Sequence, residues 1–201
     1  MSAMSKKTEQ VLRRTFKYLN KFMMTMWRLG LGSWLNAWPE KWGQIMVLAH
    51  TGRRTGIKRY TPLNFAIVEG ELYCTAGFGR IADWYRNMMA VPKVEVWLPG
   101  SKWKGGDQWW AGIAEDISGS EDRIFLMRQV LIGSGFAAYA AGINPIKMSD
   151  EELDAVSREY RLLHIQRAQA LTGLGGPGDL AWVWPVAAML LLPLALFRRR
   201  R

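Results

Sequence analysis

The chain has 201 residues, of which 49% are hydrophobic and 22% are charged, a composition typical of one packed globular domain. It contains one cysteine and two histidines, which excludes an internal disulfide and a zinc site of cysteines and histidines, so no metal site is predicted. The formal net charge of +10 is concentrated in residues 1–60 and in the last four residues. We therefore expect an anionic partner at particular places: a phosphate-bearing ligand, an anionic lipid surface or a nucleic acid.

The N-terminal segment 1–42 is predicted to contain a basic amphipathic helix. Over residues 8–29, apolar side chains recur at three- and four-residue spacing, and most lysines and arginines fall between them. Such a helix either lies on anionic lipid or packs on the domain with its lysines in solvent, and the sequence leaves both open. Basic residues interrupt every apolar stretch before residue 30, so no signal peptide is expected.

Residues 43–172 are predicted to form a mainly β (α+β) domain, a six-stranded antiparallel barrel with short peripheral helices. Most connections between strands are too short for crossover helices, which favours antiparallel pairing. The expected strands are Gln44–His50, Lys58–Val68, Glu71–Ala76, Val94–Leu98, Trp109–Glu115 and Arg161–Ala168. The expected helices are Ile81–Ala90, Ser120–Ile132 with Gly133 as its stop, and one that a capping box of Ser149 and Glu152 opens and that ends near Ser157.

The C-terminal part is predicted to be a glycine-rich linker, residues 173–179, and a hydrophobic membrane tail, residues 180–201, with an arginine cluster at its end. The uncharged residues 180–197 would extend about 27 Å as a helix. Trp182 and Trp184 at one end and arginines at the other are typical of membrane anchors, whereas Pro185 and Pro193 interrupt a helix. We expect association with the cytoplasmic face of the membrane. A buried terminal helix is the alternative.

The most informative segment is the basic turn Thr51–Arg59 between the first two predicted strands. Its glycines allow close backbone approach, and four cations with threonine hydroxyls surround it. A phosphate or a polycarboxylate needs such donors, although a solvated basic hairpin has the same composition. Walker and G-x-S-x-G motifs are absent from the chain.

A second glycine pair precedes the first predicted helix of the barrel domain. Gly77–Ala82 fits the pattern G-x-G-x-x-A, but the flanking strands are joined by hairpins, which disfavours a dinucleotide-binding fold. Glycines before a helix N-terminus still leave room for an anionic or planar ligand. Cys74 lies in an apolar strand and is predicted to be part of the core rather than a nucleophile.

The order of these motifs between Ile45 and Leu98 resembles the deazaflavin (coenzyme F420)-dependent nitroreductases, a branch of the split β-barrel flavoproteins. The matching elements are Thr51–Gly56 with Arg59, Thr61-Pro62-Leu63, Ala76–Gly79, Asp83–Asn87 and Pro92-x-Val94-x-Val96. The sequence Gly175–Trp182 is similar to the tail of a membrane-tailed subset.

The resemblance implies a split barrel that binds reduced F420 and passes hydride to a small acceptor such as a nitro compound, a quinone or an enone. FMN is the alternative cofactor, because Phe78 stands where many relatives carry a polar or basic residue. The residues that would bind the cofactor are Arg53, Arg54, Thr55 and Arg59 at its phosphate and glutamate tail, Thr61 and Pro62 at its ring or ribityl chain, the backbone of Ala76, Gly77, Phe78 and Gly79, and Trp84 and Asn87 behind it.

Two further expectations concern catalysis and assembly. Tyr139, in the apolar stretch 133–143, is a candidate proton donor to the acceptor, or else packs within a helix hairpin. A homodimer is expected, and nucleic-acid binding is disfavoured, because basic and aromatic residues do not interleave on one strand face. The alternative function is a non-catalytic split barrel that binds a lipid, haem or flavin.

Overall fold

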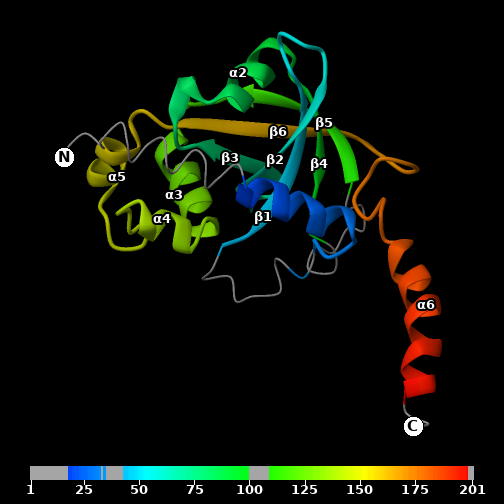
Figure 1. The fold of residues 1–201 in the computed structure, drawn as a ribbon. Helices are drawn as coiled ribbons and strands as arrows, with labels where there is room; N and C mark the ends of the chain where they lie inside the picture. The colour runs from blue at the N-terminus through cyan, green and yellow to red at the C-terminus, as the bar shows by residue number, and fades with distance from the viewer. Residues whose placement is uncertain (1–17, 33, 35–42, 100–108, 199–201) are drawn as a thin grey trace.

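Six antiparallel strands close into a barrel in the order β1-β2-β3-β6-β5-β4 (Figure 1). The computed structural model describes residues 18–32, 34, 43–99 and 109–198, with the side chains of 192–198 outside the description. The expected strands are present, and their ends differ from the predicted ones by at most two residues, so the predicted fold class is confirmed. The strands are β1 (Ile45–Thr51), β2 (Lys58–Val68), β3 (Glu71–Ala76), β4 (Lys93–Trp97), β5 (Trp109–Asp116) and β6 (Arg161–Ala170).

The barrel interior is filled by alternate residues of the strands, as the two-residue period of a strand requires. Met46 and Leu48 of β1, Phe65 of β2 and Cys74 of β3 are all fully buried in this interior cluster. Burial raises the pKa of the Cys74 thiol to about 12. The thiol therefore stays protonated, and Cys74 is a core residue, as predicted.

A helix over residues 18–28 covers the outer face of β1 (Figure 1). Trp27 of this helix packs with Val47 of β1 and Trp97 of β4, and all three are almost completely buried. This contact explains why β1 is buried on both faces. Of the amphipathic helix expected over residues 8–29, the structure describes this part, and residues 8–17 lie outside the described residues.

Helix α3 (Arg123–Gly133) packs across β2 and β3, and Gly133 at its end lets the helix lie close to the backbone of β2. A side chain at Gly133 would place its Cβ only 2.4 Å from the Phe65 carbonyl oxygen. Helix α3 ends at Gly133, the residue predicted to stop it, with Ser134 as its C-cap, and the positive φ of +51° falls two residues later, at Gly135. Gly133 therefore also serves the close packing of the helix on the sheet.

Two helices follow α3 before the last strand. The short helix α4 (Phe136–Ala140) comes directly after Gly135, and α5 (Asp150–Ser157) precedes β6. The predicted capping box of α5 is confirmed: the Ser149 side chain accepts from the Glu152 N–H, and the Glu152 carboxylate accepts from the Ser149 N–H. Such a cap stabilises a helix by about 1 kcal/mol.

The helix expected over Ile81–Ala90 is divided into two. A 3-10 turn, η3 (Gly79–Ile81), is followed by α2 (Asp83–Ala90), and Ala82 between them has extended backbone angles. Asp83 therefore becomes the first residue of α2, where its negative charge is favourable at the positive end of the helix dipole.

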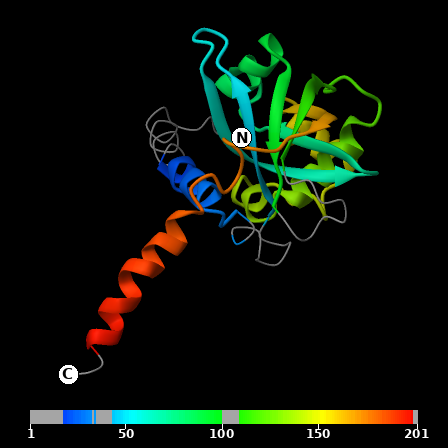
Figure 2. The ribbon, with the colours of Figure 1, turned by 90° about the vertical axis from the view of Figure 1, so that its right-hand side faces the viewer.

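Helix α6 (Val183–Arg198) extends away from the barrel, as Figures 1 and 2 both show. Pro185 lies in its first turn, where a missing N–H leaves no helix hydrogen bond unmade, so this proline does not interrupt the helix. Among the residues that the structure describes, none of the helices combines the length and the apolarity that crossing a bilayer requires.

Candidate functional site

A cavity of about 470 Å3 opens between the β1–β2 turn, the start of α2 and the helix 18–28. The turn was predicted to bind an anion from its sequence, and the cavity lies directly beside it. Seven of the predicted cofactor-binding residues line this cavity together: Arg53, Arg54, Thr55, Arg59, Thr61, Trp84 and Asn87.

The turn itself is compact because two glycines allow its backbone to fold tightly. The Gly52 N–H donates to the Ile57 carbonyl over 2.9 Å, and Gly56 has a φ of +65°. A Cβ at Gly52 would lie 2.8 Å from both Arg59 Nε and Thr55 Oγ1. The Arg59 side chain therefore lies across the turn, over the position where any other residue at 52 would place its side chain.

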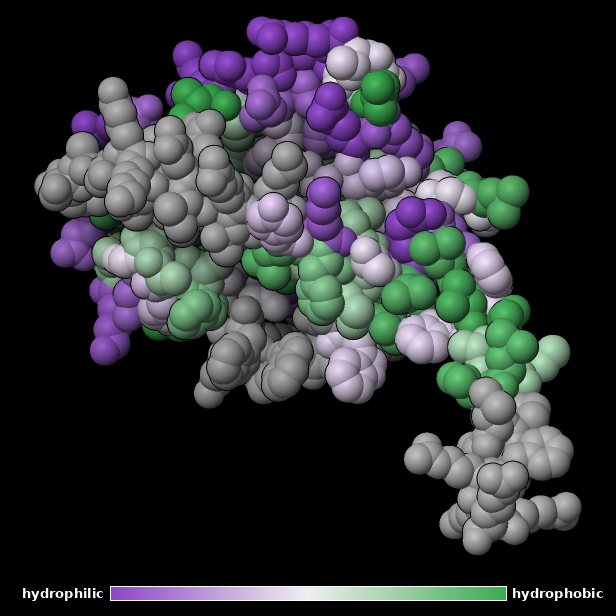
Figure 3. All heavy atoms as spheres, in the orientation of Figure 1, coloured by the Kyte–Doolittle hydropathy of each residue, from purple (hydrophilic) through white to green (hydrophobic). Residues whose placement is uncertain are grey.

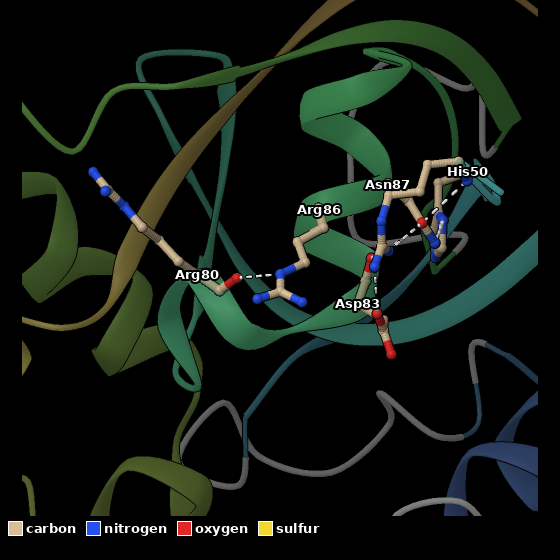
Figure 4. A network of polar contacts seen from close by, with 6 residues as sticks. His50, Arg80, Asp83, Arg86 and Asn87 are labelled. Carbon is tan, nitrogen blue, oxygen red and sulfur yellow. Dashed lines mark hydrogen bonds and ion pairs between the residues drawn. The ribbon is translucent and has the colours of Figure 1, made fainter.

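Arg53 is bound to α2 instead of pointing freely into the cavity. Its Nη1 donates to Asn87 Oδ1 over 2.9 Å, and its Nη2 forms an ion pair with Asp83 Oδ1 at 3.0 Å. The guanidinium also donates to the Asp83 carbonyl oxygen. These contacts satisfy much of the Arg53 side chain before any ligand binds, so its main role in the fold is to join the turn to the helix. Figure 4 shows its two partners on the helix, Asp83 and Asn87, with His50 beside Asn87.

His50 lies at the inner end of the same polar network and is 3% exposed. Because Asn87 Oδ1 accepts from Arg53, the Asn87 amide nitrogen faces His50 Nδ1, at 3.3 Å, and donates to it. The other ring nitrogen, Nε2, therefore carries the hydrogen and donates to Thr61 Oγ1 at 3.1 Å. Burial first, and then the positive charge of Arg59, lower the pKa of His50 to about 4, so the imidazole is neutral at neutral pH.

The remaining cations of the turn differ in how they are paired. Lys58 Nζ is bound to Glu95 Oε1 of β4 at 2.6 Å, which neutralises it. Within the described part of the chain, Arg54 and Arg59 have no acidic partner, and both are exposed at the cavity. The positive charge available to a ligand is therefore that of Arg54 and Arg59.

Several predicted residues do not line the cavity. Pro62 is buried on the opposite face of β2 from Thr61, because neighbouring side chains of a strand alternate. In the loop Ala76–Gly79, a Cβ at Gly79 would lie 2.2 Å from the Glu159 carbonyl oxygen, so the space that Gly79 provides is occupied by this chain's own backbone. Phe78 is about half exposed on this loop, and Tyr139 is about half exposed on α4.

The cavity is also lined by residues outside the predicted cofactor-binding set: Gly52 and Asp83, which belong to the recognised motifs, and Asn20, His50 and Tyr60, which the sequence did not single out. His50 could have been found, because it continues the inward-facing series of Met46 and Leu48 by the two-residue period of a strand. Asn20 belongs to a helix far away in the sequence, and no local pattern indicates that it reaches this site.

Comparison with known families places most of the sequence in one of them. The model of the F420H(2)-dependent quinone reductase family matches residues 29–149, which include the turn, α2 and five of the six strands. None of the curated proteins matches the sequence.

Solved structures with a related arrangement have low sequence identity to the chain. The haem storage protein HutZ of Vibrio cholerae is 15% identical with a TM-score of 0.43, and the match covers 70% of this chain and 92% of that one. A conserved hypothetical protein of Mycobacterium tuberculosis is 16% identical with a TM-score of 0.46, covering 68% and 87%. An F420-H2 dependent reductase, FDR-A, is 20% identical with a TM-score of 0.42, covering 61% and 94%.

Proposed function

Since the chain belongs to the F420H2-dependent quinone reductase family, we propose that the cavity at the β1–β2 turn is its F420 site and that its acceptor is a quinone. Family membership makes the protein an F420H2-dependent oxidoreductase with a small organic acceptor, as the sequence predicted. The same membership selects F420 over FMN as the cofactor and an enzyme over a non-catalytic binding protein. The quinone, among the predicted acceptors, is the one that the family's description supports.

The residues at the cavity suit the anionic end of F420. Arg54 and Arg59, the cations without an acidic partner in the described chain, supply charge-assisted donors for its phosphate and glutamate groups. Each such contact contributes about 1.5–3 kcal/mol to binding. The single observation that carries the proposal is this pair of uncompensated arginines beside a cavity in a member of an F420-dependent family.

When bound, reduced F420 supplies the hydride, and the side chains of this protein bind the cofactor and orient it toward the acceptor. Thr61 accepts a hydrogen bond from His50, so its own hydroxyl hydrogen is left to donate to a ligand in the cavity. Trp84 and Tyr60 also line the cavity, and the Tyr60 ring packs against Trp97 with the two ring centroids 5.1 Å apart. His50, whose lowered pKa keeps it neutral at neutral pH, holds Thr61 and Asn87 in place through its two ring nitrogens.

A titration tests the proposed function. Purified protein is mixed with F420 while the fluorescence of the deazaflavin is followed, and FMN is titrated in parallel. We then expect reduced F420 to be oxidised when a soluble quinone such as menadione is added, and more slowly with a nitro compound. Equal turnover with reduced FMN, or no oxidation with either acceptor, would contradict the proposal.

We also propose that the protein acts at the cytoplasmic face of the membrane. The support is its cofactor: reduced F420 is soluble and, in cells that use it, is regenerated by cytoplasmic enzymes. Protease added to intact spheroplasts should leave the barrel uncleaved, and digestion from outside would contradict this location.

A homodimer is the assembly that we propose. Its support is an apolar surface on α3 and α4, where Phe125, Ile132 and Phe136 are each at least 40% exposed. Several large apolar side chains exposed together on a protein surface mark an interaction site. Light scattering on Phe136→Ser should then give the mass of a monomer, and a wild-type protein that is already monomeric would refute the dimer.

A further inference from the structure

The start of the C-terminal segment is fixed to the end of helix 18–28 by several polar contacts. Arg28 donates through Nε and Nη2 to both carboxylate oxygens of Asp179, at 2.9–3.2 Å. Beside this ion pair, the Gly178 N–H donates to the Trp27 carbonyl oxygen and the Leu180 N–H to that of Arg28. The bidentate geometry fixes an orientation as well as a distance. We refer to Arg28 and Asp179 with these two backbone bonds as the clamp.

The contacts continue up to the first turn of α6. Trp184 Nε1 donates to the Leu29 carbonyl oxygen over 2.8 Å. Gly30, with a φ of +79°, lies against Ala181 and Gly178, and a Cβ there would be 3.5 Å from that of Ala181. Helix α6 therefore begins at a fixed position relative to helix 18–28, even though the segment before it is rich in glycine.

Beyond the clamp, α6 presents apolar side chains that no other described part of the chain covers. Met189, Leu190 and Leu191 are 61–74% exposed, and Trp182 and Trp184 are about half exposed at the start of the helix. Figure 3 shows hydrophobic residues along the described part of α6 and where it meets the domain. So large an uncovered apolar helix on a protein surface marks an interaction site.

Helix 18–28 adds apolar surface on the same side of the barrel. Figures 1 and 2 place it and α6 on one side, and Tyr18, Leu19 and Phe22 are 45–72% exposed on it. The charge of the two segments is positive: residues 18–34 and 180–201 contain no Asp or Glu, the chain ends in four arginines, and Asp179 beside them is paired with Arg28. An apolar surface with tryptophans and an excess of cations matches an anionic lipid bilayer better than it matches a second copy of itself, whose cations would repel.

We propose that α6 and helix 18–28 form one docking surface for an anionic bilayer, and that the clamp sets the position of the pocket relative to that bilayer. Helix 18–28 connects the two sites: Arg28 at its end forms the clamp, and Asn20 near its start lines the pocket. A lipid-soluble acceptor then reaches the pocket from the bilayer in one orientation. This inference rests on the proposed function, because it assigns the route by which a quinone reaches that same pocket.

The docking surface is tested with the full-length protein and vesicles that sediment. Binding to vesicles containing phosphatidylglycerol should be at least about tenfold tighter than to vesicles of phosphatidylcholine alone. Leu190→Glu with Leu191→Glu changes exposed positions and should abolish this binding while the oxidation of F420H2 by menadione continues. Equal binding to both kinds of vesicle, or unchanged binding of the double variant, would overturn the docking surface.

The clamp is tested by comparing two acceptors in the same anionic vesicles, a long-chain quinone held in the bilayer and water-soluble menadione. Asp179→Asn should still bind vesicles and reduce menadione at the wild-type rate, but reduce the long-chain quinone about tenfold more slowly. Exchanging the pair, Arg28→Asp with Asp179→Arg, should restore the rate with the long-chain quinone. Asp150→Asn, which removes the ion pair with Arg128 between α3 and α5, is the matched control and should change neither rate.

The outcomes separate this inference from the proposed function. If the wild-type protein binds anionic vesicles but oxidises F420H2 with neither acceptor, the proposed function fails and the docking surface stands. If Asp179→Asn slows both acceptors equally, or neither, the clamp does not position the pocket and that part of the inference is overturned.

Discussion

Arg53 donates twice to the same oxygen of Asn87, from its backbone N–H over 3.1 Å and from Nη1 over 2.9 Å. The two bonds connect the basic turn to α2, and the ion pair of Arg53 with Asp83 strengthens the connection. Adjacent arginines of one motif therefore have different tasks. Arg53 holds the turn in place, and Arg54 leaves its charge for a ligand.

The first prediction concerns Arg54. Arg54→Ala should weaken F420 binding by about tenfold or more, because one charge-assisted contact is worth about 1.5–3 kcal/mol. Fluorescence titration of F420 measures the change. Lys58→Ala is the control from the same turn: its charge is already neutralised by Glu95, so the affinity should stay near the wild-type value. An unchanged affinity in Arg54→Ala would contradict the role of this arginine.

The second prediction concerns the connection between the turn and α2. Asn87 is 4% exposed and bonds to both Arg53 and His50, so Asn87→Ala should destabilise the fold by about 1–3 kcal/mol. Urea unfolding followed by tryptophan fluorescence measures this loss. Asn20→Ala, at the wall of the same cavity, should leave the free energy of unfolding within a few tenths of a kcal/mol of the wild type. A free energy of unfolding equally unaffected in Asn87→Ala would show that the network is not needed for stability.

The third prediction is a pH dependence. The native pKa of His50 is about 4, below its ordinary value of 6.5, so between these values the unfolded chain binds a proton that the native protein does not. Stability should therefore fall as the pH is lowered through this window, by about 1.4 kcal/mol for each pH unit, and this loss is complete below pH 4. In His50→Gln, the free energy of unfolding should depend less steeply on pH between pH 6.5 and 4.5, because this contribution is missing. Parallel slopes for the two proteins would contradict the assignment.

The fourth prediction concerns where the C-terminal segment can be removed. A chain ending at Trp184 keeps the clamp and should bind F420 as the full chain does, without binding vesicles. A chain ending at Gly176 loses the clamp, including the backbone bonds to the Trp27 and Arg28 carbonyl oxygens, so its melting temperature should be several degrees lower. Equal melting temperatures would mean that residues 177–184 add nothing to the fold.

The strands could be predicted because each has a clear apolar pattern, and four of them, β1 to β4, have a glycine or proline within two residues of each end. The sequence could not show how strands and helices approach one another. Gly133 resembles a helix stop in the sequence, and only the position of the Phe65 carbonyl shows that it is needed for close packing. The loop with Gly79 is similar: its glycine admits the Glu159 backbone and not a ligand.

The part of the site that one continuous segment of the sequence forms could be predicted. The basic turn is one continuous segment, so Arg54, Thr55 and Arg59 were identified from its composition, and all three line the cavity. The role of Arg53 depends on partners 30 and 34 residues away, Asp83 and Asn87, which no pattern within the turn reveals. The predicted domain boundaries, and Tyr139 as a proton donor, stay predictions.

Cys74 is a built-in probe for transient opening of the barrel, because the rate at which its thiol is labelled depends on how often the barrel opens. It is the sole thiol of the chain, it lies in the centre of the barrel, and its pKa of about 12 leaves almost no thiolate at neutral pH. A thiol reagent can therefore react with it only while β3 is separated from its neighbours. The rate of labelling with and without F420 then reports how often the barrel opens, with no engineered probe and no change to the sequence.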